Sequence, residues 1–233
     1  MKFVFLAWKT PPQILCMPVV FTRTIAPGSL FGVWHATEDA ETLLRQLDLD
    51  PEDETIYGSI HNRNRKLQWL GCRMALSHLL QTPKIGIRYT NYGKPLLVSG
   101  LAHLSFTHSG PYAAAICSPT SIVGIDLEQV REKINRVAER FLTPRELTLA
   151  SGADRLEVLT LFWAAKETLY KINGKPDLDI QHDLCIESFD YLCATGGELI
   201  ARIKDRGNAP GIPVSYHRLE DVILTWAMVP ENH

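Results

Sequence analysis

Two carboxylates stand at the end of a short apolar run. The segment Ser121-Ile-Val-Gly-Ile-Asp-Leu-Glu128 predicts a strand, and residues two apart in a strand share a face, so Asp126 and Glu128 point the same way. Such a pair can simply face solvent, but the apolar neighbours Ile125 and Leu127 favour a buried strand. A buried carboxylate needs a partner or a metal, because an isolated buried charge is costly. The segment therefore indicates a metal site.

A second group of charges falls on a helical pattern in Leu161-Phe-Trp-Ala-Ala-Lys-Glu-Thr-Leu-Tyr-Lys171. Glu167 and Lys171 could form an ordinary surface pair at i,i+4, which is worth only a few tenths of a kcal/mol. However, Trp163 and Lys166 fall on the same broad face, and a face that mixes aromatic and charged side chains indicates the wall of a site. A third carboxylate at Glu167 completes the oxygen-rich shell that Mg²⁺ prefers when it also holds substrate phosphates.

These two segments resemble the paired signature of the 4'-phosphopantetheinyl transferases. Three further segments resemble the longer, surfactin-synthetase-activating branch of that superfamily. They are Arg65-Lys-Leu-Gln-Trp-Leu-Gly-Cys-Arg73, Asn91-Tyr-Gly-Lys-Pro95 and Leu104-Ser-Phe-Thr-His-Ser-Gly110. The Asp-x-Glu spacing alone is common, but five segments in the family's order over residues 65–171 make a specific pattern.

The resemblance implies a fold and a reaction. It implies an α+β protein of two similar α/β halves, residues 1–123 and 124–233, related by a pseudo-twofold axis with the ligand cleft between them. The implied reaction moves the 4'-phosphopantetheine arm of coenzyme A to a serine of an acyl or peptidyl carrier protein. It requires Mg²⁺ and releases 3',5'-ADP.

The resemblance also assigns roles to residues of this chain. The implied metal ligands are Asp126, Glu128 and Glu167. The implied catalytic groups are Glu167, Lys166 and His108. The implied contacts to coenzyme A are Arg65, Arg73, Lys94, Thr107, His108, Ser109, Lys166 and Lys171. Whether Glu167 takes the serine proton directly or through a metal-bound water stays open. So do simpler readings, in which Lys94 and the two arginines are solvated and His108 is structural.

One stretch departs from the family pattern. Some longer members carry lysines upstream that meet the 3'-phosphate of coenzyme A, whereas Pro51-Glu-Asp-Glu-Thr55 is acidic. Either Arg63, Arg65 or Lys66 takes over that contact, or the 3'-phosphate is held weakly.

The partner and two rival functions follow from the same residues. Carrier proteins are acidic around their target serine, and Lys133, Arg136 and Arg140 share one face if their segment is a helix, directly after Arg131. A solvated basic face is the alternative. The rivals are a Mg²⁺-dependent phosphohydrolase, against which the lack of a P-loop counts, and a non-catalytic coenzyme A or carrier-binding module, which would not need every carboxylate and lysine.

Composition sets broad limits. The chain has 233 residues, 45% hydrophobic and 21% charged, with a net charge of −2, so no global charge favours nucleic acid or a membrane surface. Five cysteines without CxxC spacing suit reduced thiols in the cytoplasm. The apolar start, residues 1–8, is too short for a signal peptide and predicts a first strand. We expect a monomer, because one chain supplies the whole cleft.

Periodicity and turn residues predict the elements. Expected strands are 2–8, 30–36, 85–89, 95–98, 103–107, 112–117, 121–127, 184–190, 197–204, 213–218 and 221–229. Expected helices are 38–47, 63–81, 131–150 and one that opens with the capping box Asp154-x-x-Glu157 and stops at Asn173-Gly174. Within 131–150, Thr143-Pro144 with Glu146 predicts a second helix start.

Overall fold

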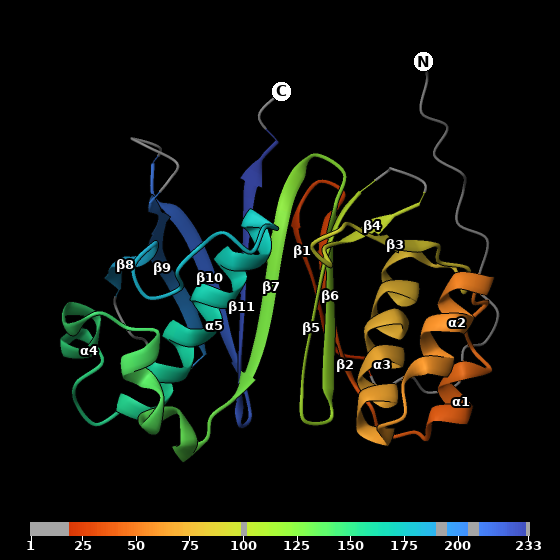
Figure 1. The fold of residues 1–233 in the computed structure, drawn as a ribbon, viewed down its shortest axis with the longest axis horizontal. Helices are drawn as coiled ribbons and strands as arrows, with labels where there is room; N and C mark the ends of the chain where they lie inside the picture. Colours follow the sequence, from red (N-terminus) through yellow and green to blue (C-terminus); the bar gives the residue numbers. More distant parts are fainter. Residues whose placement is uncertain (1–18, 99–101, 190–194, 205–209, 232–233) are drawn as a thin grey trace.

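The structure is a computed structural model that describes residues 19–98, 102–189, 195–204 and 210–231. It is an α+β fold with two antiparallel sheets, which confirms the predicted fold class (Figure 1). The expected strand at 2–8 and two of the five cysteines, Cys16 and Cys193, lie outside the described residues. Within the described residues, no helix is long and apolar enough to cross a membrane.

The first sheet has the strand order β1-β2-β6-β5-β4-β3. Its strands are β1 Val19–Ala26, β2 Ser29–His35, β3 Ile87–Tyr89, β4 Pro95–Leu97, β5 His103–Ser109 and β6 Tyr112–Ser118. Three helices lie on its outer side, α1 Ala40–Leu44, α2 Pro51–Ser59 and α3 Arg63–Leu80. The elements expected from the sequence include neither β1 nor α2.

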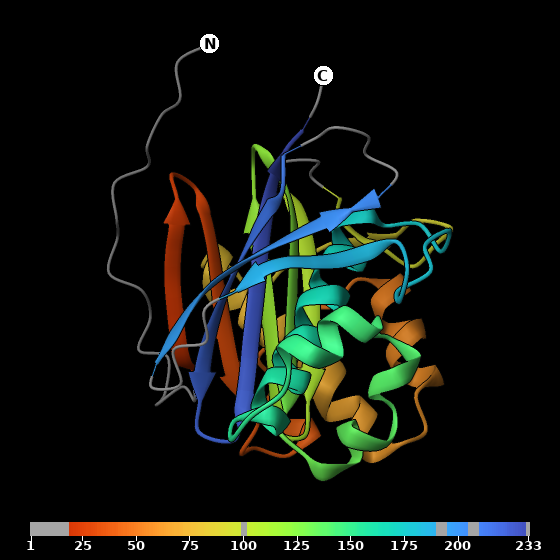
Figure 2. The ribbon, with the colours of Figure 1, turned by 90° about the vertical axis from the view of Figure 1, so that its left-hand side faces the viewer.

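The second sheet has the order β7-β11-β10-β9-β8. Its strands are β7 Ser121–Gln129, β8 Leu184–Phe189, β9 Gly196–Ile203, β10 Ile212–Leu219 and β11 Val222–Pro230. The helix α5 (Arg155–Asn173) packs on β7 and β11, with the shorter α4 (Pro144–Leu149) beside it (Figure 2). The chain passes from one sheet to the other between Ser118 and Ser121. The domain boundary at residues 123 and 124 stays a prediction.

The fold has four layers, in the order helix, sheet, sheet and helix, and a hydrophobic cluster fills each of the three spaces between them (Figure 1). The middle cluster joins the two sheets face to face and includes Phe31 and Val33 from the first sheet and Ile125, Leu127 and Trp226 from the second. Apolar residues therefore line both faces of β7, whose residues 123–127 are all buried. A strand covered on both faces reads as a near-continuous apolar run, as this one does.

The predicted helix over 131–150 is wrong in its first half. This stretch contains two short 3₁₀ turns, η1 (Glu132–Arg136) and η2 (Ala138–Arg140), before α4 begins. Thr143 and Glu146 do form the predicted capping box of α4, and Pro144 occupies its first turn. The capping box predicted at Asp154 is wrong, because the Asp154 side chain makes no capping hydrogen bond.

Gly124 lets α5 approach β7 closely. A Cβ at Gly124 would lie 2.3 Å from the Thr168 carbonyl oxygen of α5, which is backbone and cannot move aside. This contact fixes the distance between the strand that carries Asp126 and the helix that carries Glu167.

Gly124→Ala should therefore lower the free energy of unfolding by roughly 1–3 kcal/mol, the usual cost of overpacking. The matched control is Gly58→Ala in α2, where a Cβ would meet nothing within 4 Å, and where alanine should be neutral or stabilising. Urea denaturation of both variants measures the difference. Equal stability of the two variants would contradict the close approach.

Candidate active site

A ladder of side-chain hydroxyls joins the two sheets. β7 is an edge strand, and its outward backbone N–H groups find acceptors on alternate residues of β5. The bonds run from Ile125 N to Ser105 Oγ at 3.3 Å, from Leu127 N to Thr107 Oγ1 at 3.1 Å and from Gln129 N to Ser109 Oγ at 3.3 Å. Side chains two apart in a strand share a face, so three hydroxyls at this spacing match every second amide of β7. These backbone N–H groups of the buried edge strand thus have hydrogen-bond acceptors, although the strands of the two sheets do not pair through their backbones.

The ladder occupies the hydroxyls of Thr107 and Ser109, whose contact with coenzyme A stays a prediction. The single hydroxyl proton of Thr107 is donated to Asp126 Oδ1 at 2.9 Å, so Thr107 has none left for a ligand. Ser109 Oγ lies 3.5 Å from Glu128 Oε2 and accepts the Gln129 amide. In this structure both residues position β7 and its carboxylates, and neither offers a free donor to coenzyme A.

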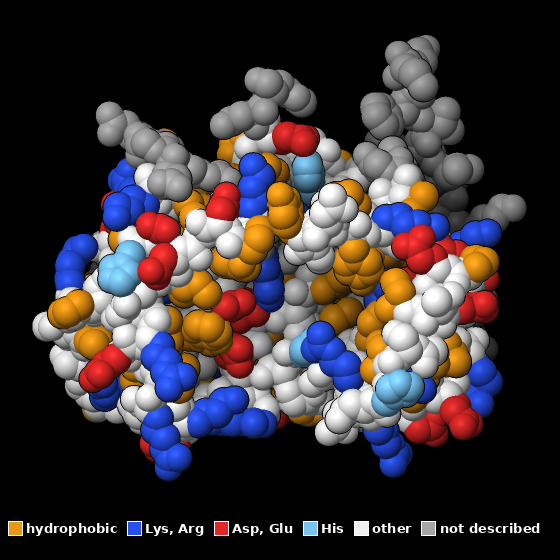
Figure 3. All heavy atoms as spheres, in the orientation of Figure 1, with side chains coloured by type: hydrophobic (Ala, Val, Ile, Leu, Met, Phe, Trp, Pro, Cys, Tyr) orange, Lys and Arg blue, Asp and Glu red, His pale blue; other side chains and the backbone are white. Residues whose placement is uncertain are grey.

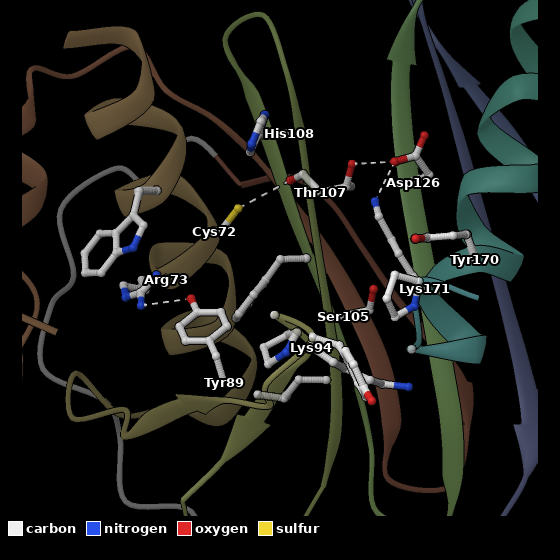
Figure 4. A pocket seen from close by; sticks show the side chains of 18 of the residues that line it. Cys72, Arg73, Tyr89, Lys94, Ser105, Thr107, His108, Asp126, Tyr170 and Lys171 are labelled. Atoms are coloured by element: carbon white, nitrogen blue, oxygen red, sulfur yellow. Dashed lines mark hydrogen bonds and ion pairs between the residues drawn. The ribbon is translucent and has the colours of Figure 1, made fainter. Parts of the chain in front are cut away.

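Asp126 is the most enclosed of the three predicted metal ligands. Its side chain is 6% exposed, and Oδ1 accepts hydrogen bonds from Thr107 and from Lys171 Nζ at 2.6 Å (Figure 4). Its other oxygen, Oδ2, is buried and has no hydrogen-bond partner. A buried carboxylate oxygen without a donor is costly, and it is open to a cation.

Glu128 and Glu167 lie close enough to Asp126 to feel its charge. Burial and the neighbouring Asp126 raise the pKa of Glu128, although the Trp163 indole N–H donates to Glu128 Oε1 at 2.9 Å. Burial, followed by Asp126, raises the pKa of Glu167 to about 7, and Glu128 contributes in the same direction. The strand and the helix therefore bring the three predicted carboxylates into one electrostatically coupled cluster.

The donor set of this cluster fits a divalent cation. The described residues contain no group of three or more His, Cys, Asp or Glu side chains already arranged around a metal position. The unpartnered Asp126 Oδ2 and the raised pKa values of both glutamates are what a hard, oxygen-binding cation would relieve.

A cavity of about 410 Å³ opens beside the cluster, between the two halves. Its wall combines the cations Arg65, Lys94, Lys171 and Lys175 with the aromatic side chains Trp69, Tyr89, Tyr92 and Tyr170. Figure 4 shows Tyr89 and Lys94 of the β3–β4 hairpin opposite Tyr170 and Lys171 at the end of α5. In the space-filling view, acidic and basic side chains meet at a hollow between the halves (Figure 3). The cavity can hold an anionic ligand that also carries a flat or apolar part.

His108 and Arg65 lie together at one side of this cavity. Arg65 Nη1 is 2.5 Å from His108 Nε2. Burial, and then the charges of Arg65 and Lys171, lower the pKa of His108, so its ring is neutral at pH 7 and Nε2 accepts from the guanidinium. The ring then carries its N–H on Nδ1.

Arg73 takes a different role from the predicted one. Its guanidinium is 2% exposed, forms an ion pair with Asp53 at 2.6 Å and stacks over Trp69 at 3.2 Å from the ring centroid. The acidic stretch that departs from the family pattern thus contains the buried partner of this arginine. With its charge neutralised by Asp53, Arg73 lines the cavity but is not a free phosphate ligand. Of the three alternatives for the 3'-phosphate, Arg65 is the one that lines the cavity.

Lys166 is also placed away from the cavity. It is fully buried, and its ammonium binds Glu146 Oε2 at 2.9 Å and the Phe141 carbonyl at 2.7 Å. The carbonyls of Ile180 and Gln181 complete its surroundings. Lys166 therefore ties α5 to α4 in this structure, and its predicted role as a phosphate contact and catalytic group stays a prediction. Neighbouring residues in a helix are turned about 100° apart, so Lys166 and Glu167 point to different sides.

Lys94 joins the two halves at the mouth of the cavity. Its Nζ donates to the Ile172 carbonyl at 3.2 Å, at the C-terminal end of α5, where a cation also meets the negative end of the helix dipole. Gly174, in the left-handed conformation at φ 69°, ends the helix and leaves room for the Lys94 side chain. Lys94 lines the cavity, and its contact with coenzyme A stays a prediction.

Sequence analysis did not assign Trp69, Tyr89 or Tyr92 to the site. Trp69, Tyr92 and Tyr170 all stand inside the quoted motifs, and Tyr89 lies two residues before one of them. Lys175 stands in Gly174-Lys-Pro176, which repeats the Gly93-Lys-Pro95 triplet. That repeated triplet was the available signal, because both copies line the same cavity.

Comparison with known proteins agrees with this geometry. Residues 122–203, which include β7 and α5, match the model of the 4'-phosphopantetheinyl transferase superfamily, and this confirms the predicted resemblance. The chain is 31% identical over 110 residues to the 4'-phosphopantetheinyl transferase Sfp of Bacillus subtilis (strain 168), covering 44% of this chain and 48% of Sfp.

Two further relatives carry the same name. The chain is 30% identical over 119 residues to the 4'-phosphopantetheinyl transferase AcpT of Escherichia coli (strain K12), covering 47% of this chain and 59% of that protein. It is 32% identical over 108 residues to the 4'-phosphopantetheinyl transferase gsp of Aneurinibacillus migulanus, covering 44% and 45%. The matched stretches thus span about half the length of these relatives.

The raised pKa of Glu167 predicts a pH dependence of stability. The unfolded carboxyl ionises near its ordinary value of 4.5, whereas the folded one keeps its proton to about pH 7. Unfolding therefore releases a proton between these pH values, and the contribution of Glu167 to stability falls as the pH rises through that window. Glu167→Gln should become progressively more stable than the unmodified protein from pH 5 to pH 8.

Urea denaturation at pH 5 and pH 8 in a chelating buffer measures this difference. Glu54→Gln, at an exposed position of α2, is the control and should show no such trend. A Glu167→Gln difference that stays constant with pH would contradict the coupling of Glu167 to the other carboxylates.

Proposed function

We propose that this protein transfers the 4'-phosphopantetheine arm of coenzyme A to a serine hydroxyl of a carrier protein. The observation that supports this most directly is the placement of Asp126, which is coupled to Glu128 and Glu167, in the wall of a cationic and aromatic cavity between the two halves. Such a cavity suits a diphosphate joined to a nucleoside, and the carboxylates suit a cation that accompanies the diphosphate.

In the proposed reaction the serine oxygen attacks the β-phosphorus of coenzyme A. The bond from that phosphorus to the bridging oxygen breaks, and 3',5'-ADP leaves. A divalent cation held by Asp126, Glu128 and Glu167, Mg²⁺ in our proposal, would supply neutralisation of the diphosphate charge. The role of the protein is then to position the reactants and to stabilise charge.

Side chains of the cavity have defined tasks in this scheme. Arg65, Lys94 and Lys171 bind phosphate oxygens, and His108 donates from Nδ1 toward the same anion. Glu167 accepts the serine proton, directly or through a water. A carboxyl whose pKa lies near 7 is suited to this task, because it exchanges protons close to neutral pH.

We further propose an acidic acyl or peptidyl carrier protein as the partner, docking on the segment that follows β7. Arg131, Lys133, Arg136 and Arg140 are all exposed there. Lys133 lowers the pKa of Glu128, so this basic surface adjoins the carboxylate cluster. Figure 3 shows basic side chains gathered along the lower edge of the half that carries α4 and α5. The 3₁₀ geometry still places Lys133 and Arg136 on one face, because three residues make one turn.

The proposal extends to the setting of the protein. We infer a monomer, since one chain supplies both walls of the cavity. We also infer that the protein acts in the cytoplasm. A role in binding nucleic acid or a membrane is not part of the proposal, because the net charge is −2 and the basic side chains are local.

Transfer is tested by mass spectrometry of an apo carrier protein incubated with the enzyme, coenzyme A and Mg²⁺. The carrier should gain the mass of one phosphopantetheine group, EDTA should abolish the gain, and added Mg²⁺ or Mn²⁺ should restore it. Glu167→Gln should lower turnover roughly a hundredfold or more, because it removes a ligand and the proton acceptor at unchanged size. Glu54→Gln is the matched control.

Release of inorganic phosphate without modification of the carrier would favour the phosphohydrolase rival. Binding of coenzyme A without any turnover would favour the non-catalytic module. Full activity in EDTA would remove the cation from the scheme.

Reversal of Lys133, Arg136 and Arg140 to glutamate should raise the KM for the carrier and leave coenzyme A binding unchanged. The reason is that these side chains lie outside the cavity and steer an acidic partner, an effect screened beyond about 8–10 Å at physiological salt. The control reverses three exposed cations elsewhere, Arg45, Lys84 and Lys204, with the same change in net charge. Steady-state kinetics at low and high ionic strength measure both variants, and an equal KM for the two would make the surface an ordinary solvated one.

A further inference from the structure

Lys171 is the only ion-pair partner of the carboxylate cluster among the described residues. Its Nζ lies 2.6 Å from Asp126 Oδ1 and 2.9 Å from the Ile125 carbonyl, at the point where the last turn of α5 meets β7 (Figure 4). Neither Glu128 nor Glu167 forms an ion pair within the described part of the chain. One lysine thus balances one of three adjacent carboxylates.

This pair differs from the structural ion pair in the same helix. Lys166 and Glu146 are 0% and 3% exposed, and the ammonium of Lys166 is surrounded by four acceptors. Lys171 is 26% exposed and lines the cavity, and Asp126 keeps one buried oxygen without a partner. The Lys166–Glu146 pair is therefore enclosed by protein. In the Lys171–Asp126 pair, by contrast, both the ammonium and the second carboxylate oxygen can still bind a ligand.

We propose that Lys171 is an internal cation that competes with the divalent metal for Asp126. The inference rests on the proposed function, which places a metal on this cluster. A metal at the free oxygen of Asp126 would share one buried carboxylate with the Lys171 ammonium, and like charges so close repel strongly where water is excluded. Each cation therefore weakens the hold of the other on Asp126.

Release of Lys171 has a consequence for substrate binding. A flexible, partly exposed lysine that leaves Asp126 remains within the cavity, where the diphosphate of coenzyme A is its next available partner. The lysine in this way couples the metal to the phosphate ligand, because either one makes it easier for the other to bind. Before the metal and coenzyme A bind, the same lysine stabilises the fold, because it pairs with an Asp126 carboxylate that would otherwise be buried without a partner.

The test measures Mn²⁺ binding to the protein without coenzyme A, from the electron paramagnetic resonance signal of free Mn²⁺. Lys171→Met should bind Mn²⁺ at least about tenfold more tightly than the unmodified protein, the scale of one charge-assisted contact. Lys175→Met removes an equal charge from the same cavity without touching Asp126, and it should change the affinity less than about twofold. Asp126→Asn should abolish the tight binding in the Lys171→Met background.

Thermal melting gives a second measurement. Without metal, Lys171→Met should melt below the unmodified protein because Asp126 loses its partner, and saturating Mn²⁺ should raise its melting temperature by more than it raises that of the unmodified protein. If the methionine variant does not fold, Lys171→Gln keeps a neutral donor toward Asp126 and carries the same expectation.

The outcomes separate this inference from the proposed function. If the unmodified protein binds Mn²⁺ through Asp126 but Lys171→Met binds it no more tightly, the competition is wrong and the metal site stands. An equal gain from Lys175→Met would reduce the effect to general charge and also overturn the competition. If Asp126→Asn changes nothing in any background, the metal site of the proposed function fails as well.

Discussion

The hydroxyl ladder between β5 and β7 is the interaction on which the site depends. An edge strand buried between two sheets must satisfy its outward amides, and here Ser105, Thr107 and Ser109 do so in place of a backbone partner. A side-chain ladder keeps two sheets joined without merging them into one. The separation that it leaves is where the cavity opens, with Asp126 held at its edge by Thr107.

Negative charge at this junction is unevenly compensated. Burial and then Asp126 raise the pKa of both Glu128 and Glu167, and Lys171, which lowers both, forms its ion pair with Asp126. The neighbouring cavity carries positive charge from Arg65, Lys94 and Lys175. An acidic cluster beside a cationic cavity suits a metal and an anion that bind together, and the close contact of Gly124 with α5 fixes how near the carboxylates stand.

The helix α5 divides its charged residues between structure and chemistry. Lys166 points into the interior and joins α4 through Glu146, while Glu167 and Lys171 point toward β7 and the cavity. On the opposite wall, α3 does the same with Arg73, which is closed by Asp53, and Arg65, which is exposed beside His108. In both helices a motif residue that reads as a ligand in the sequence serves the packing of its own half.

The sequence by itself determined the α+β class, most strands, the long helices α3 and α5, and the carboxylates Asp126, Glu128 and Glu167. Local periodicity predicts the strands and helices, whereas the fold class and the roles of the carboxylates came from the family resemblance. Only the tertiary structure decided which charged motif residues are free, because Asp53 and Glu146 lie 20 residues from Arg73 and Lys166 along the chain. It also decided that Thr107 serves the sheet junction and that 131–142 forms 3₁₀ turns. Burial and partner choice are set by the packing of distant segments, which spacing along one segment does not encode.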